Sequence, residues 1–310
     1  MELKHISVLL DESVTMLGVK DNGIYVDGTL GGGGHSKLIL EKMGGGRLIG
    51  VDQDTDAILA ATERLKEYKD KFTAVHNNFS NIKEILKELN IEEIDGAILD
   101  LGVSSHQLDE GERGFSYNKD ARLDMRMNKE QSFSAYELVN TYSESDLKRI
   151  IYAYGEERFA PAIARTIVSE REKKPIETTF ELSDIIKKAM PKEARQKDKH
   201  PAKRTFQAIR IEVNRELEIL EGAIRDFVSV LKPGGVLSVI TFHSLEDRIV
   251  KTVFNDLASG CTCPKNFPVC VCNKKPIVKL YNKKPIVSGE EELKNNNRAH
   301  SAKLRGIIKL

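Results

Sequence analysis

The sequence IYVDGTLGGGGH, residues 24–35, decides the fold of this chain. Its first three residues are β-branched or aromatic, and they predict a buried parallel strand. An aspartate and a run of glycines follow, and the apolar spacing of residues 36–43 predicts a helix behind them. A strand, a glycine loop and a helix form the opening unit of a nucleotide-binding α/β sheet. The glycines let the backbone approach a ligand closely, and they leave N–H groups at the helix start.

A second strand is predicted over residues 47–52, and it ends in Asp52. A carboxylate at this place suits the hydroxyl groups of a ribose. The loop lacks the GxGxxG spacing of dinucleotide sites, and Asp27, just before the glycines, suits the amino group of an amino-acid moiety. These features together predict the S-adenosylmethionine site of a class I methyltransferase. A purely structural turn is the alternative, and four consecutive glycines argue against it because they lose much backbone entropy on folding.

The composition indicates a soluble globular protein of about two domains. The chain has 310 residues, of which 40% are hydrophobic and 31% are charged. No apolar run approaches the roughly 18 residues of a membrane span. The first residues, MELKHISVLLDE, carry charges where a signal peptide needs an apolar region. We therefore expect a cytoplasmic protein that does not contact a membrane.

Two basic segments stand out in a chain whose formal net charge is +1. Residues 187–210 hold nine Lys or Arg against two Asp or Glu, and residues 273–310 hold ten against three. Each segment therefore carries a net charge of +7. Basic segments of this kind suit a polyanion surface. A solvated helix face explains each segment, taken singly, about as well.

Two further strands are predicted at residues 72–76 and 94–100. The carboxyl ends of parallel strands meet at one edge of a sheet, where ligands bind. We therefore expect one crevice lined by a residue from each strand end: Asp27, Asp52, Phe79 and Asp100. Phe79 either packs on the adenine of the cofactor or belongs to the core. Asp100 either acts in the reaction or serves the cofactor.

A fifth strand is predicted at residues 236–242, after the turn sequence LKPGG. More than a hundred residues separate it from the fourth strand, and an insertion of this length is expected to form a domain of its own. Its pattern is helical and includes a long helix over residues 205–220. Residues 277–281 and 302–309 are expected to close the sheet as an antiparallel pair.

The expected fold is thus an α/β, Rossmann-like class I core with a mostly parallel seven-stranded sheet. The core comprises residues 1–106 and 216–310, and residues 107–215 form an inserted helical domain for substrate recognition.

Four cysteines lie in two C-x-C pairs near the C-terminus: Cys261, Cys263, Cys270 and Cys272. Four thiolates can bind zinc, although structural zinc sites usually use the C-x2-C spacing. Free thiols are the alternative that we favour, and a reducing compartment disfavours a disulfide. We therefore expect no metal site and keep zinc as the alternative.

At this point the chain resembles the RsmH (MraW) family of N4-cytosine methyltransferases of bacterial small-subunit ribosomal RNA. The matching stretches cover nearly the whole chain: HISVLLDE, VDGTLGGGGHS, GVDQD, DLGVSS, RGFSY, LDMRM, RTFQAIRIEVN, LKPGG, FHSLEDR and SAKLRGI. The resemblance implies a class I core with a helical domain inserted after the fourth strand. It also implies S-adenosylmethionine as the cofactor, bound at Gly33, Gly34, His35, Asp52, Phe79, Asp100 and Gln107.

The resemblance further implies that the target is the exocyclic amine of a cytidine in the decoding region of 16S rRNA, within the small ribosomal subunit. We expect Asp100 to be catalytic, as an acceptor for the hydrogens of that amine. A homodimer is one assembly that we consider. A regulatory cofactor-binding protein and a DNA or small-molecule methyltransferase are the alternatives.

The residues that hold the RNA are open. The D/S/N-P-P-Y/F motif of many amino-directed DNA methyltransferases is absent, since residues 100–103 read DLGV. The candidate rings for stacking on the cytosine are Phe115, Tyr117, Phe242 and His243. The candidate phosphate ligands are Arg113, Arg122, Arg126, Lys203, Arg204, Arg210 and Arg248.

Overall fold

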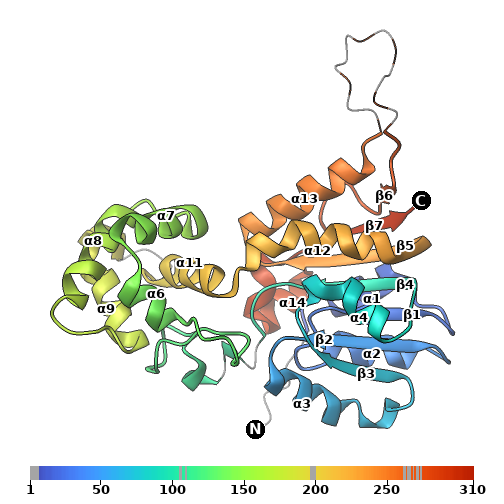
Figure 1. Cartoon of the computed structure of the whole chain (residues 1–310), viewed down its shortest axis with the longest axis horizontal. Helices are drawn as coiled ribbons and strands as arrows, with labels where there is room; N and C mark the ends of the chain where they lie inside the picture. Colours follow the sequence, from blue (N-terminus) through green and yellow to red (C-terminus); the bar gives the residue numbers. More distant parts are fainter. Residues whose placement is uncertain are drawn as a thin grey trace. The chain divides into compact units, whose positions relative to one another are not determined.

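Figure 1 shows the computed structural model of the chain. The structure describes residues 7–104, 107–108, 110–195, 200–260, 263, 267, 269, 272 and 274–310. The chain divides into two compact units. The first combines Met1–Gly102 with Leu217–Leu310, and the second is Val103–Glu216.

The first unit is built on a seven-stranded sheet with the order β3-β2-β1-β4-β5-β7-β6. Strands β1 to β5 pair in parallel, and β7 runs antiparallel to both β5 and β6. This is the strand order of class I methyltransferases, and the predicted fold class is confirmed. The strands are β1 Ile24–Asp27, β2 Arg47–Asp52, β3 Phe72–His76, β4 Ile94–Asp100, β5 Leu231–Thr241, β6 Val278–Leu280 and β7 Lys303–Lys309.

Helices cover both faces of this sheet, because the parallel strands are apolar on both sides. One core cluster joins the strands to α4, α12 and α13, and the other joins them to α1 and α2. Phe227 of α12 and Leu40 of α2 are fully buried, one in each cluster. The helices of this unit are α1 Leu10–Leu17, α2 Gly34–Lys42, α3 Thr55–Arg64, α4 Ile82–Glu88, α12 Glu216–Val230, α13 Ser244–Ala258 and α14 Glu290–Asn295, with short 3-10 turns η1 Lys66–Tyr68, η2 Phe79–Asn81 and η4 Asn297–Ser301.

Strand β5 begins five residues earlier than its apolar run predicts. Leu231 already pairs with Ile94, and the register shifts before Gly96 pairs with Val236. The LKPGG sequence is therefore an irregularity within the strand, with Gly234 at φ 81°, rather than a turn in front of it. The local pattern of proline and glycine indicates the bend but not the pairing that continues through it.

The second unit is helical and has an apolar core of its own. Its helices are α6 Ala135–Thr141, α7 Glu144–Gly155, α8 Ala160–Arg171, α9 Thr179–Ala189, α10 Lys192–Arg195 and α11 Lys203–Asn214, with the 3-10 turn η3 Gly111–Arg113. Side-chain caps begin three of them. Ser143 caps α7, while Ser134 and Thr178 form capping boxes on α6 and α9.

The predicted long helix over residues 205–220 is wrong, because the chain breaks at Arg215. This residue adopts a left-handed conformation, with φ 52°, between α11 and α12. The last residue of α11, Asn214, is held by tertiary contacts. Its Oδ1 accepts the N–H of Met127 at 2.8 Å, and its Nδ2 donates to the carbonyl of Met125 at 2.8 Å. The apolar period runs across the break and therefore cannot reveal it.

Over the described part of the chain, the helices do not combine the length and the apolar character that crossing a membrane demands.

Candidate cofactor and catalytic site

The glycine loop after β1 is fastened to three strand ends of the first unit. The N–H of Leu30 donates to the carbonyl of Val51 at 3.0 Å. The N–H of Gly31 donates to Asp52 Oδ2 at 2.8 Å, and the hydroxyl of Thr29 accepts the N–H of Asp100 at 2.6 Å. The loop thus joins the carboxyl ends of β1, β2 and β4, where an open α/β sheet binds its ligands.

Glycine is required at the entry to α2. Gly33 precedes the helix in a left-handed conformation, with φ 72°, which strains any residue with a Cβ. At Gly34 a Cβ atom would lie 2.0 Å from the hydroxyl oxygen of Ser7. The first N–H groups of a helix have no partner within it, so this helix start can receive the carboxylate of an amino acid.

Asp52 is at the end of β2 and is held by the backbone around it. Its Oδ2 accepts the N–H of Gly31, and its Oδ1 accepts the N–H of Asp54 at 2.9 Å. Burial raises the pKa of Asp52 to about 6, and these N–H groups oppose the rise. A carboxylate offers about four acceptor sites, so Asp52 keeps capacity for a ribose hydroxyl.

Phe79 lies beside the same loop, at the start of η2 just after β3. A Cβ atom on Gly28 would lie 3.3 Å from Cβ of Phe79 and 2.5 Å from a methyl group of Leu99. Phe79 is partly buried and packs against the core cluster under α12. Phe79 thus contacts the core while part of its ring stays accessible. Packing in the core and packing on an adenine are therefore compatible for this residue.

The side chains of Asp27 and His35 are buried inside the first unit. Asp27 is 1% exposed, and its oxygens accept the N–H of Thr29 at 3.2 Å and the hydroxyl of Ser36 at 2.7 Å. His35 is 4% exposed and contacts the carbonyl of Val8 through Nε2 at 3.2 Å. These side chains build the loop and its entry segment. The structure thus gives Asp27 a different role from the predicted direct contact with an amino group.

Asp100 presents an unused acceptor at the end of β4. Its side chain is 23% exposed, and Oδ1 has no hydrogen-bond partner in the described part of the structure. Oδ2 lies 3.9 Å from Nδ1 of His35. Burial raises the pKa of Asp100 to about 7; the charge of Arg298 opposes this rise, and the charge of Glu246 adds to it. A buried carboxylate oxygen that accepts no hydrogen bond from the described residues is suited to a cationic or N–H-bearing ligand.

Gln107 belongs to the second unit, so the structure does not group it with the other six predicted cofactor residues. Its side chain is 4% exposed, and its Oε1 accepts the N–H of Ser104 at 3.0 Å. Its role toward the cofactor stays a prediction.

The four candidate stacking rings have different surroundings. Phe115 is buried in the core of the second unit, and Tyr117 stacks on His200 with ring centroids 4.4 Å apart. Phe242 lies under the guanidinium of Arg298, 5.3 Å from its ring centroid. His243 caps α13 in a capping box with Glu246. Each of the four rings thus has a partner in the structure, and which of them stacks on a base stays a prediction.

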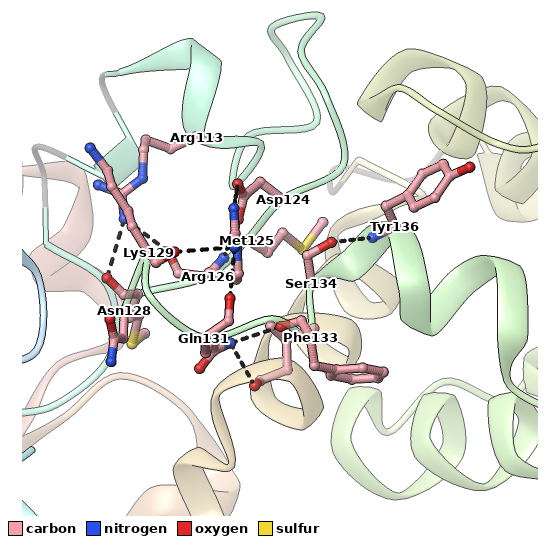
Figure 2. A network of polar contacts seen from close by, with 12 residues as sticks. Arg113, Asp124, Met125, Arg126, Asn128, Lys129, Gln131, Phe133, Ser134 and Tyr136 are labelled. Atoms are coloured by element: carbon pink, nitrogen blue, oxygen red, sulfur yellow. Dashed lines mark hydrogen bonds and ion pairs between the residues drawn. The ribbon is translucent and has the colours of Figure 1, made fainter.

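Two of the candidate phosphate ligands are internal, as Figure 2 shows. Arg126 forms a bidentate pair with Asp124, at 2.7 and 2.8 Å, and also donates to the carbonyl of Gln131. Arg113 is buried and donates to the carbonyl of Arg126 at 2.8 Å. These guanidinium groups tie the loop before α6 together, which uses them structurally.

Arg210 is similarly paired with Glu216, at 2.8 and 2.9 Å. Four candidates are exposed: Arg122, Lys203, Arg204 and Arg248. Sequence position alone does not separate the internal arginines from these four, because the carboxylates and carbonyls that receive them are set by the fold.

Arg298 is a residue that the sequence reasoning missed. It lies in η4, just before β7, and outside the motifs used to predict the site, and its charge reaches Asp100 through the tertiary structure. Its place in a generally basic C-terminal segment was the one signal present.

The zinc alternative is not tested, because Cys261 and Cys270 lie outside the described residues. In the part of the chain that the structure describes, no group of three or more His, Cys, Asp or Glu side chains could hold a metal ion.

The comparisons with known proteins identify the family of this chain. The model of the MraW methylase family matches residues 2–310. The chain belongs to this family. Two curated relatives named ribosomal RNA small subunit methyltransferase H are similar over nearly their whole length. The one from Clostridium botulinum (strain Loch Maree / Type A3) is 61% identical over all of both chains, and the one from Lachnospira eligens is 58% identical over 98% of this chain and 97% of its own.

Solved structures are similar at lower levels. A putative rRNA methylase from Clostridium thermocellum gives a TM-score of 0.46 at 12% identity, over 99% of this chain and all of its own. A putative methyltransferase from Streptococcus mutans in complex with SAH gives 0.43 at 12% identity, over 99% of this chain and all of its own. The assignment to the MraW family rests on the family model and the curated relatives. It confirms the predicted family and a methyltransferase that uses S-adenosylmethionine as its cofactor.

Proposed function

We propose that this MraW-family chain transfers a methyl group from S-adenosylmethionine to N4 of a cytidine in the decoding region of 16S rRNA. The substrate is the small ribosomal subunit, and the reaction takes place in the cytoplasm. The names of the curated relatives support the ribosomal substrate. The observation that carries the proposed chemistry is Asp100, whose Oδ1 ends a strand at the ligand edge of the sheet and accepts no hydrogen bond from the described residues.

The first unit supplies fitting residues for the cofactor. Asp52 receives the ribose, Phe79 packs beside the adenine, and the N–H groups at Gly33 and Gly34 receive the carboxylate of the methionine moiety. The carboxylates of this edge suit a ligand that carries positive charge. When bound, S-adenosylmethionine supplies an electrophilic methyl group on a good leaving group. Gln107 is kept as a proposed cofactor contact on the family resemblance alone.

Asp100 supplies what the amine needs. The lone pair of cytosine N4 is delocalised into the ring, so the amine is a poor nucleophile. A carboxylate that accepts an N4–H bond stabilises the positive charge that develops on this nitrogen during transfer. Asp100 then takes the proton that the methylated nitrogen releases, for which a pKa of about 7 is well matched. Alignment of the amine with the methyl group supplies a further part of the acceleration.

The second unit is proposed as the substrate-recognition domain. A cytidine inside a helix cannot reach such an acceptor, so the target nucleotide must be unpaired or extruded. Tyr117 and His200 form a stacked aromatic pair, and Lys203 and Arg204 are exposed near the start of α11. These residue types bind the bases and phosphates of single-stranded RNA.

The test is methylation of small ribosomal subunits that lack the modification. Purified protein and tritiated S-adenosylmethionine are incubated with these subunits, with naked 16S rRNA, with DNA and with free cytidine. We expect incorporation into the subunits, and mass spectrometry of the rRNA should place one methyl group on the N4 of one cytidine. Label in DNA or free cytidine instead, or cofactor binding without any transfer, would overturn the proposal.

The homodimer is a separate prediction. Sedimentation of the purified protein measures it directly, and a monomer over the working concentration range would show it to be wrong.

A further inference from the structure

Arg298 is held in a defined place within the first unit. It is the second residue of η4, and its N–H donates to the capping side chain of Asn296 at 3.2 Å. Its guanidinium carbon lies 5.3 Å from the ring centroid of Phe242. A guanidinium on an aromatic face is held by a cation–π interaction, which restricts a side chain that is otherwise flexible.

Phe242 brings this guanidinium to the ligand edge of the sheet. The ring follows β5, whose residue Ile240 pairs with Asp100 of β4. Just after β4, a Cβ atom on Gly102 would lie 3.7 Å from the Phe242 ring. The guanidinium of Arg298, seated on Phe242, therefore lies close to the ends of β4 and β5, and Asp100 is the last residue of β4.

Among the described residues, the other groups that act on Asp100 are anionic or neutral. Asp27 of β1 and Glu246 of α13 are buried carboxylates, and both repel a charge on Asp100. His35 of α2 is in close contact, but burial lowers its pKa, so it is neutral near pH 7. Among the described groups that face Asp100, the guanidinium of Arg298 is thus the cation that favours an ionised carboxylate.

We propose that Arg298 is a positioning residue for the reaction, and that its guanidinium, seated on Phe242, keeps Asp100 ionised as the acceptor for the substrate amine. This inference rests on the proposed function, because it gives Asp100 the acceptor role. A protonated Asp100 has one lone-pair oxygen fewer to offer and cannot take the proton from N4. An opposite charge nearby is the ordinary means by which a protein favours the ionised form of a carboxyl group.

The test compares the pH dependence of kcat for the wild type, Arg298→Gln and Arg298→Lys. The substrates are unmethylated small subunits and saturating S-adenosylmethionine. We expect the acid limb of the Arg298→Gln profile to move to higher pH. If the midpoint of the limb rises by one pH unit, kcat of the variant is about tenfold lower than that of the wild type at pH values below both midpoints. At high pH the two kcat values are nearly equal. Arg298→Lys keeps the positive charge, so the midpoint of its acid limb should lie close to that of the wild type.

A merely structural role predicts a different result. Loss of packing would lower kcat by the same factor at every pH, and Arg298→Lys would not restore it. Arg225→Gln is the matched control, because Arg225 of α12 is paired with Glu221 and Asp256 at the surface of the same unit. Its profile should overlay that of the wild type. Parallel profiles for wild type and Arg298→Gln would overturn the inference.

A second measurement keeps this inference separate from the proposed function. Carboxyl-carbon NMR titration of Asp100 reports its ionisation without any turnover. Arg298→Gln should raise the midpoint of this titration, and an unchanged midpoint would overturn the inference. Absence of methylation by the wild type would overturn the proposed function, while the titration still reports on Arg298.

Discussion

At the scale of single residues, two aspartates of the site lie where burial disfavours their ionised form. Asp52 and Asp100 have pKa values raised to about 6 and about 7, and burial is the first cause for both. Because their pKa values are higher in the folded than in the unfolded state, ionising these two carboxyl groups lowers the stability of the folded protein. A protein tolerates this at a place where a ligand later supplies the missing donors or positive charge.

Asp100→Asn should remove turnover while leaving the fold intact. The amide cannot take a proton from N4, so we expect kcat at saturating S-adenosylmethionine to fall by about 100-fold or more. Asp95→Asn is the matched control, since Asp95 lies in the same strand and is paired with Lys232 at 2.7 Å. That control should lower stability and leave kcat unchanged. Near-normal turnover of Asp100→Asn would exclude the acceptor role.

The stability of the unliganded protein should carry the signature of Asp100. The folded pKa is about 7 and the unfolded value is 3.8, so the folded state binds the extra proton between these values. The contribution of Asp100 to stability therefore falls as pH rises from about 4 to about 7. Urea unfolding at a series of pH values should show Asp100→Asn gaining on the wild type through this window, by ~1.4 kcal/mol per pKa unit. A constant difference would contradict the raised pKa.

At the scale of elements, local signals predicted most of the architecture. The β-branched strands and the glycine loop are short-range features, and these elements occur where the features indicate. The early start of β5 and the break at Arg215 were not predictable in this way. Both depend on partners far along the chain, such as Ile94 and Met127, which a local pattern does not contain.

The loop between β1 and α2 should be sensitive to a single methyl group. Gly33→Ala forces a side chain into a left-handed conformation, at a cost of about 1 kcal/mol, and should weaken binding of S-adenosylmethionine. Gly222→Ala is the opposite case, because this helical position of α12 has open space around it and should gain about 1 kcal/mol. Thermal unfolding and calorimetry measure both effects. Equal cofactor affinity in the two variants would show that the loop geometry is not needed.

At the scale of the whole molecule, two units divide the proposed work. The first has the sheet and the candidate cofactor residues, and the second has its own helical core. The predicted boundaries, at residues 106/107 and 215/216, lie close to those of the compact units, at 102/103 and 216/217. Substrate recognition by the second unit stays a proposal, supported by its exposed basic residues.

Binding of the small subunit should weaken steeply with rising salt concentration. Replacing an exposed basic side chain should change this salt dependence more than replacing one that is paired within the protein. Lys203→Gln removes an exposed charge and should lower the slope of log affinity against log salt by about 0.7–0.9. Arg126→Gln removes the hydrogen bonds of Arg126 in the network of Figure 2. It should lower the folding stability and leave the slope of log affinity against log salt nearly unchanged. Filter binding at several salt concentrations measures the slopes. A flat salt response of the wild type would contradict a phosphate-binding role for the basic segments.

The sequence by itself determined the class of fold, the order of its strands along the chain, and the residues at the strand ends, because alternation, glycine runs and caps act over a few residues. Tertiary structure alone decided the surroundings of several charged groups. Arg113 is buried and donates to the carbonyl of Arg126, and Arg298 lies against Phe242. The physical reason is that a charge takes its role from its neighbours in space, and in this chain those neighbours can be far apart in the sequence, as Glu292 and Leu9 are, with a separation of 283 residues.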